Sequence, residues 1–292
     1  MDEREALELL GAALPAAGDD AAVVGSTAIT TDMLHESTDF PAGTTRYTAG
    51  WRSVAASLSD LAAMGAAPTA AVAAYADEAF VDHDLEAFLD GARSVCKTVD
   101  ADYVGGDLDT HCEFTVTTTA IGAAPDPVYR SGATIGDRLC VTGTMGRSAA
   151  ALRLFDRGEP ERANELFRFA PRVAAGRQLA GVATAMMDSS DGLARSLHQL
   201  AEASDCGFAV DREAVPIDTS VDAVTDDPVD RWKAGVHFGE DFELVCTLPA
   251  DELDAVAADL STPLTPIGRV TDEGVRVDGD PLPDRGYTHA RE

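Results

Sequence analysis

The side chains best suited to do chemistry in this chain are acids and hydroxyls that stand where apolar segments break. They are Asp20, Thr30, Thr31, Asp32, Asp60, Asp107, Asp188, Ser190 and Asp191. Oxygen ligands of this kind suit Mg²⁺, which in proteins commonly joins a few carboxylates to the phosphates of a substrate. Each residue also has an ordinary interpretation: Ser190 could cap a helix, and Asp107 could begin a turn. Taken together, the set favours a metal site.

Asp60 has the most unusual setting of these residues. We predict a helix over residues 45–64, and beyond its first turn the only other charged side chain is Arg52. Arg52 stands eight positions before Asp60, about 80° round the helix, so helical spacing does not pair them. A carboxylate beside apolar residues needs compensation when it is desolvated. Because Lys97 and Lys233 are the only lysines, a metal ion is the favoured partner; the alternative is an acid on the exposed helix face.

The composition describes a folded protein without a membrane segment. The chain has 292 residues, of which 45% are hydrophobic and 25% charged, which suits one large or, more readily, two domains. No run approaches the roughly 18 apolar residues of a membrane span, and the opening Met-Asp-Glu-Arg-Glu does not begin a signal peptide. We therefore expect a cytoplasmic protein. Five scattered cysteines argue against a disulfide framework or a structural zinc site.

The charge balance narrows the choice of partners. With 51 acids against 22 basic residues, the formal charge is -29, so nucleic acid and anionic membranes are poor partners. The acids are spread along the chain and arginine far outnumbers lysine, a composition typical of proteins from a cytoplasm of high salt concentration. We therefore expect a halophilic source and count only acids in unusual contexts as candidates for a site.

The alternation of helical and strand patterns predicts an α+β protein. Two short strands flank Gly25 and end at Asp32, and the helix with Asp60 follows them. Further along come an apolar strand over 69–75, a helix over 82–99, a short strand at 103–104 before Asp107, and a strand over 114–121. Residues 128–136 form a linker, and a second α+β unit begins at about residue 138.

Several familiar sites are excluded by motif. No Gly-x-x-x-x-Gly-Lys-Ser/Thr loop, no Gly-x-Ser-x-Gly elbow and no His-Glu-x-x-His sequence occurs, and the six histidines show no metal-ligand spacing. Residues 143–146, Gly-Thr-Met-Gly, precede a predicted helix and could offer backbone amides to a phosphate. Residues 238–244, FGEDFEL, are more unusual because three acids alternate with aromatic and apolar residues, which places Glu240 and Asp241 at the mouth of a strand.

At these residues the sequence resembles the thiamine-monophosphate kinase family of the aminoimidazole ribonucleotide synthetase-like superfamily. The matching segments, in order, are GDDAAVV, ITTDML, SLSDLAAMGAAP, GGD, YRSGA, VTGTMGRSAAAL, MDSSDGL, EASDCG and GEDFEL. The resemblance covers nearly the whole chain. It implies a homodimer of chains with two α/β domains: residues 1–130, which bind metal and ATP, and residues 131–292.

The resemblance also implies roles for individual residues. Metal ligands would be Asp20, Thr30, Thr31, Asp32, Asp60, Asp107, Asp188 and Asp191. Gly106, Asp107, Arg130 and Ser190 would contact ATP, with Asp60, Asp107 and Arg130 at the reacting groups. Several Mg²⁺ ions would bridge the phosphates of ATP to these acids. The acceptor, thiamine monophosphate, offers an oxygen that is already anionic, so charge neutralisation and in-line alignment matter more than a general base.

Two positions depart from the family pattern. Relatives often have histidine where this chain has Asp39, so Asp39 is the candidate substrate contact, with His35 as the alternative. Glu240 and Tyr287 are the other candidates for the thiamine side.

Two other functions stay open from the sequence. One is a different ATP-dependent enzyme of the superfamily, such as an aminoimidazole ribonucleotide synthetase. The other is a nucleotide-binding relative that does not catalyse a reaction.

Overall fold

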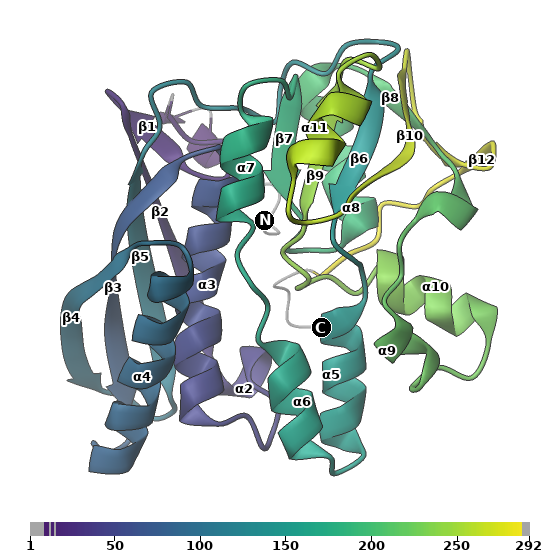
Figure 1. Cartoon of the computed structure of the whole chain (residues 1–292). Helices are drawn as coiled ribbons and strands as arrows, with labels where there is room; N and C mark the ends of the chain where they lie inside the picture. The colour runs from purple at the N-terminus through teal and green to yellow at the C-terminus, as the bar shows by residue number, and fades with distance from the viewer. Residues whose placement is uncertain (1–8, 12, 15, 288–292) are drawn as a thin grey trace.

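The first half of the chain forms a sheet whose one face is covered by two long helices (Figure 1). The computed structural model describes residues 9–11, 13, 14 and 16–287. The order of the first sheet is β1 (Ala22–Val24), β2 (Thr27–His35), β5 (Thr115–Ala123), β3 (Ala67–Asp77) and β4 (Asp102–Thr110). Neighbouring strands are antiparallel except β3 and β4, which are parallel. The short helix α2 (Glu36–Asp39) follows β2, and α3 (Arg46–Ala63) and α4 (Asp82–Thr98) cover the sheet.

The second half contains a sheet of seven strands. Its order is β12 (Asp280–Pro281), β11 (Val275–Val277), β8 (Gly207–Val210), β10 (Leu264–Thr271), β6 (Arg138–Thr142), β9 (Leu244–Leu248) and β7 (Ala185–Asp188). Helix α8 (Leu193–Ser204) packs its leucines on one face, while α7 (Val173–Leu179), α11 (Leu253–Asp259) and the end of α3 pack on the other. The remaining helices are α5 (Arg147–Asp156), α6 (Pro160–Phe167), η1 (Arg212–Ala214), α9 (Thr219–Asp222) and α10 (Pro228–Val236). The predicted α+β class is confirmed.

Helix α3 joins the two halves. Its N-terminus is capped by Thr45, whose side chain accepts a hydrogen bond from the Thr48 amide at 3.1 Å. Nearly every residue of α3 is buried. Residues between Ala49 and Leu61 pack in the core of the first sheet, while Ala62 and Ala63 enter the core of the second. In return, Phe169 and Phe242 from the second half enter the first core, stacked with ring centroids 4.2 Å apart. Among the described residues, no helix combines the length and apolar character that crossing a membrane requires.

The crossing of α3 and α4 depends on two glycines. A Cβ on Gly50 would lie 2.1 Å from the Phe88 carbonyl oxygen, and one on Gly91 would lie 2.0 Å from the Tyr47 carbonyl oxygen. The two helix backbones are therefore in direct contact, and neither position has room for a methyl group.

We expect Gly50→Ala to lower the free energy of unfolding by about 3 kcal/mol, because the added methyl group must push the two helices apart. Urea unfolding at constant salt measures the change. The matched control is Gly181→Ala, where the nearest atom to a new Cβ would be 3.9 Å away, so its effect should stay within about 0.5 kcal/mol. Equal effects of the two substitutions would contradict the tight crossing.

Candidate functional site

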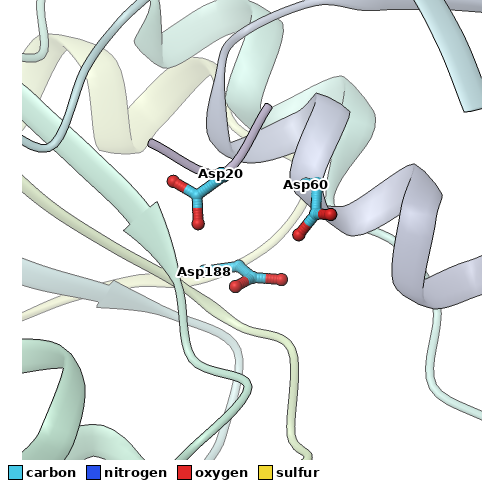
Figure 2. A group of neighbouring side chains, drawn as sticks. All are labelled: Asp20, Asp60 and Asp188. Atoms are coloured by element: carbon cyan, nitrogen blue, oxygen red, sulfur yellow. The ribbon is translucent and has the colours of Figure 1, made fainter. Parts of the chain in front are cut away.

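Three of the predicted metal ligands meet where the two halves touch (Figure 2). Asp20 precedes β1, Asp60 lies on α3, and Asp188 ends β7. One carboxylate oxygen of each lies within 4.8 Å of the others. The side chains of Asp20 and Asp188 are buried and that of Asp60 is nearly so. We call these three residues the aspartate cluster; their spacing and all-oxygen chemistry fit a divalent cation such as Mg²⁺.

Hydroxyl groups hold the carboxylates of the site in place. Thr30 donates a hydrogen bond to Asp60, and Ser59 donates one to Asp188 at 2.6 Å. Asp32 lies on the same face of β2 as Thr30 and accepts a hydrogen bond from Ser57 of α3 at 2.5 Å. Serine and threonine on α3 and β2 therefore orient the acids without neutralising their charge.

The electrostatics of the cluster favour protonation when no cation is bound. Burial raises the pKa of Asp60 well above its usual range, and the neighbouring charges of Asp32, Asp188 and Asp20 raise it further. Burial, followed by repulsion from Asp20, raises the pKa of Asp188 to about 8. Burial also raises the pKa of Asp32. Such shifts mark carboxylates that are gathered to hold a positive charge.

Arg130 provides a cation at the edge of the cluster. Its guanidinium donates to both carboxylate oxygens of Asp20, at 2.8 and 3.3 Å, and its backbone amide donates to Asp19 at 2.6 Å. The linker that carries Arg130 is therefore tied to the loop before β1. Arg130 offsets one charge of the cluster and leaves the remaining carboxylates uncompensated by an ion pair among the described residues.

Thr31 and Asp107 lie on the other face of the first sheet. Burial alternates along β2, so that Thr30 and Asp32 face α3 whereas Thr31 is exposed. Asp107 pairs with Ala74 of β3, and both are exposed on the face turned away from α3. Strand β4 is three strand steps from β2, roughly 14 Å. The structure of one chain therefore divides the predicted ligands between two faces.

Gly106, beside Asp107, has no room for a side chain. A Cβ at this position would lie 1.7 Å from the Ala73 carbonyl oxygen of β3. Strand β4 is also longer than the short strand predicted at residues 103–104, because its pairing with β3 continues past the two glycines to Thr110.

The loop that follows Asp188 is fixed by backbone hydrogen bonds. The Ser190 carbonyl accepts from the Glu240 amide at 2.5 Å, and the Asp191 carbonyl accepts from the Tyr287 amide at 3.1 Å. Ser190, Asp191, Glu240 and Tyr287 therefore lie together next to Asp188. The alternative that Ser190 caps a helix is wrong, because α8 begins at Leu193 with Gly192 at the cap position.

Arg52 is a buried residue of the site whose role sequence analysis missed. Its guanidinium donates to the Glu240 carboxylate at 2.5 Å and to the Phe167 carbonyl at 2.6 Å, and lies over the Phe167 ring. The prediction that helical spacing would not pair Arg52 with Asp60 is confirmed. No local signal links Arg52 to Glu240, because 188 positions separate them.

The prediction that residues 143–146 offer amides to a phosphate is wrong. The Asp241 side chain lies where the phosphate was expected. Its carboxylate accepts hydrogen bonds from the Gly146 amide at 2.5 Å and the Ser148 amide at 3.1 Å. Burial raises the pKa of Asp241 to about 7. An internal carboxylate therefore caps α5 and takes the amides that a phosphate would need, while the Gly143 and Met145 amides donate to backbone carbonyls.

We expect Asp241→Ala to destabilise the chain by about 2 to 4 kcal/mol, because it leaves the buried amides of Gly146 and Ser148 without an acceptor. Asp241→Asn keeps one acceptor oxygen and should cost less. Denaturant unfolding of the two variants measures the difference; a loss from alanine no larger than that from asparagine would refute the capping role.

Asp39 and His35 lie together at the end of β2. Asp39 accepts hydrogen bonds from the His35 amide and the Thr38 hydroxyl, both at 2.7 Å. The His35 ring contacts the Thr115 hydroxyl at 3.1 Å. Asp39 thus closes α2 against the strand and is half-buried.

Comparison with known proteins follows the same division of the chain. Residues 18–124 match the family model "AIR synthase related protein, N-terminal domain", and residues 134–280 match "AIR synthase related protein, C-terminal domain". The fold and its acidic site therefore define a protein of the AIR synthase-related class.

Individual relatives narrow this class. The chain is 62% identical to thiamine-monophosphate kinase of Halobacterium salinarum, over 99% of this chain and 100% of that protein, and 39% identical to that of Methanospirillum hungatei, over 99% of both. Among solved structures, AaThiL complexed with AMPPCP and TMP superposes with a TM-score of 0.90 at 26% identity, covering 99% of this chain and 97% of the other. The chain belongs to the thiamine-monophosphate kinase family.

Proposed function

We propose that this chain transfers the terminal phosphoryl group of ATP to thiamine monophosphate, forming thiamine diphosphate. The observation that carries the proposal is the aspartate cluster at the junction of the two halves, in a chain 62% identical over its length to a thiamine-monophosphate kinase. A related structure, AaThiL, is complexed with AMPPCP and TMP, which supports ATP as the donor and thiamine monophosphate as the acceptor.

The donor set fits Mg²⁺. Asp20, Asp60 and Asp188 would hold the ions, with Asp32 and Asp191 beside them. Burial and the neighbouring acids raise the pKa values of Asp60 and Asp188, which supports a bound cation as their partner. When bound, Mg²⁺ neutralises the phosphates and orients them for in-line transfer. Its oxygen ligands are hard donors, which magnesium prefers to nitrogen or sulfur.

The residues of the chain then position two polyanions. Arg130 lies beside Asp20 and brings a fixed positive charge to the transferring group, and Ser190 contacts the nucleotide from the adjoining loop. Glu240 and Tyr287, which flank that loop, and Asp39 at the end of β2 bind the thiamine side. The attacking oxygen of thiamine monophosphate is anionic at neutral pH, so the site needs no general base.

A homodimer would use the exposed face of the first sheet. Apolar side chains protrude there from several strands: Val24, Ile29, Met33, Val104 and Ile121. Exposed apolar patches of this kind mark protein interfaces. Thr31, Gly106 and Asp107 lie on or beside this face, so a second copy seated on it would place residues of its own next to them. The domain boundary near residue 130 would leave this face within the N-terminal domain.

We expect Met33→Arg to convert the dimer to monomers and to lower turnover at least tenfold, because it places a charge on the apolar face. Light scattering in molar KCl measures the mass, with Val229→Arg as the control: Val229 is similarly exposed but lies on α10. A Met33→Arg variant that remains dimeric and active would rule out this face.

The acid excess supports two further parts of the proposal. A net charge of -29 is suited to a cytoplasm of high salt, where counterions screen the repulsion among surface carboxylates. We therefore place the enzyme in the cytoplasm of a halophile.

The direct test is ADP release from ATP and Mg²⁺ in molar KCl, with and without thiamine monophosphate. Turnover that depends on thiamine monophosphate supports the proposed reaction. Calorimetric binding of Mg²⁺ and ATP without such turnover would reject it and favour another ATP-dependent enzyme of the class or a non-catalytic relative.

A further inference from the structure

Three arginines lie in one row across four neighbouring strands of the second sheet. In strand register, Arg138 of β6 is opposite Arg269 of β10, Arg269 is opposite Ala209 of β8, and Ala209 is opposite Arg276 of β11. Residues that pair directly on neighbouring strands project from the same face of a sheet. All three arginines are exposed, and the small Ala209 leaves space between Arg269 and Arg276. We call Arg138, Arg269 and Arg276 the arginine row.

The arginine row lacks acidic partners. Within residues 16–287 none of the three forms an ion pair, and Arg276 makes one hydrogen bond, to the Gly279 carbonyl at 3.2 Å. Elsewhere in the second half, Arg153, Arg195 and Arg231 all pair with carboxylates. Like charges on directly opposed strand positions are unfavourable. In a chain with more than twice as many acids as bases, this arrangement leaves guanidinium groups available to an external anion.

A groove opens over two of these arginines. It has a volume of about 660 Å³ and is lined by Arg138 and Arg269, together with Ala209 and the apolar Leu253 of α11 and Pro266 of β10, whereas Arg276 lies outside its lining. The start of α11 forms part of the wall of the groove, since Leu253 and Asp254 both line it. A groove of this size accepts a small organic molecule.

Three acids line the groove and indicate which kind of ligand it could bind. Asp211 already accepts from the Glu213 amide at 3.0 Å, and Asp278 accepts from the Arg212 amide at 3.1 Å. Asp254, in the first turn of α11, also lines the groove, and among the described residues it accepts no hydrogen bond. The combination of two guanidinium groups with a carboxylate acceptor suits a phosphate ester that also carries hydroxyl groups, better than a bare inorganic anion.

The groove is separate from the aspartate cluster. Strand β9 pairs with both regions: its Leu244 is opposite Asp188 and its Leu248 is opposite Arg138. The two positions are four residues apart along β9, roughly 13 Å, and lie on strands to either side of it, roughly 10 Å apart. A ligand in the groove therefore does not reach the proposed site of phosphoryl transfer.

We propose that the groove over the arginine row is a second binding site, for a small hydroxylated organic phosphate. Arg138 and Arg269 bind the phosphate group together, Arg276 adds positive charge at the far end of the row, and Asp254 accepts a hydrogen bond from a ligand hydroxyl. The phosphate relieves the repulsion between the opposed arginines. Binding involves no covalent step and no metal.

Calorimetry with ribose 5-phosphate, on the full chain in molar KCl with EDTA, tests the site. The chelator keeps the aspartate cluster free of the metal it would need to hold a phosphate. We expect binding by the natural chain and at least tenfold weaker binding by the Arg138→Gln/Arg269→Gln double variant. The matched control, Arg157→Gln/Arg162→Gln, removes the same charge outside the groove and should bind as the natural chain does.

Two further variants separate the contribution of the planar guanidinium group from that of the Asp254 carboxylate. Arg269→Lys keeps the charge but loses the planar fork, and should weaken binding several-fold. Asp254→Asn should weaken binding of ribose 5-phosphate and leave inorganic phosphate unaffected. The site is rejected if the natural chain gives no heat with ribose 5-phosphate, or if both double variants lose binding equally. Thermal unfolding without ligand confirms that each variant is folded.

Discussion

We expect Asp60→Asn to abolish phosphoryl transfer, by a factor on the order of a thousand or more, in a chain that stays folded. Asp60 is the member of the aspartate cluster that α3 contributes. Its carboxylate lies against Asp20 and Asp188, and within the described part of the chain it forms no ion pair. Asparagine keeps the shape and the hydrogen bond with Thr30 but removes the charge that attracts a cation. Thiamine-monophosphate-dependent ADP release measures the loss.

Stability separates this interpretation from a structural one. In EDTA, Asp60→Asn should be at least as stable as the natural chain, because asparagine is uncharged at every pH whereas Asp60 must bind a proton to avoid a buried charge. Stabilisation by Mg²⁺ should fall sharply in the variant. The matched control is Asp90→Asn, an exposed acid on α4, which should change neither property. An active Asp60→Asn variant would show that the cluster is not the site of the reaction.

The second large effect that we expect is a change in the stability of the metal-free chain with pH. In the folded, metal-free chain the pKa of Asp188 is raised to about 8 and that of Asp60 well above its usual range, whereas both return to about 4 on unfolding. Between these values the folded state holds more protons than the unfolded state, so stability falls as pH rises. For Asp188 alone the loss between pH 4 and pH 8 is on the order of 5 kcal/mol.

Melting curves in EDTA should show a decrease on the order of 10 °C from pH 5 to pH 8. With Mg²⁺ present the trend should reverse, because metal binding requires the deprotonated carboxylates and tightens as protons leave. Asp188→Asn should flatten both curves. A metal-free chain whose melting temperature rises over this range would contradict the raised pKa values.

The sequence supplied the members of the aspartate cluster but not their geometry. Asp60 stood out because it was an isolated acid in an apolar helix, and Asp20 and Asp188 because each lay at the end of a strand pattern. Sequence alone could not show that Asp188, 128 positions after Asp60, meets it across the junction of two sheets, because that contact depends on how α3 packs against both cores. The motif resemblance provided the grouping, and the structure provides the distances.

The other wrong or missed predictions fall into two groups: one could have been avoided from the strand pattern, and the others depended on tertiary packing. The alternation along β2 already separates Thr31 from Thr30 and Asp32, so the division between faces was readable from the period of a strand. The role of Asp241 was not, since a glycine-rich turn before a helix looks the same whether a phosphate or an internal carboxylate caps it. The Arg52–Glu240 pair was equally hidden, because both residues had to be placed by tertiary packing.

The exchange of side chains between the two cores has a consequence for synthesis of the protein. The core of the first half includes Phe169 and Phe242, which the ribosome adds long after β5 is complete. At roughly 5 to 20 residues per second, the emerging first half waits on the order of ten seconds for its last core residue. During that interval its apolar surface is unprotected, so the nascent chain depends on chaperones more than two self-contained domains would.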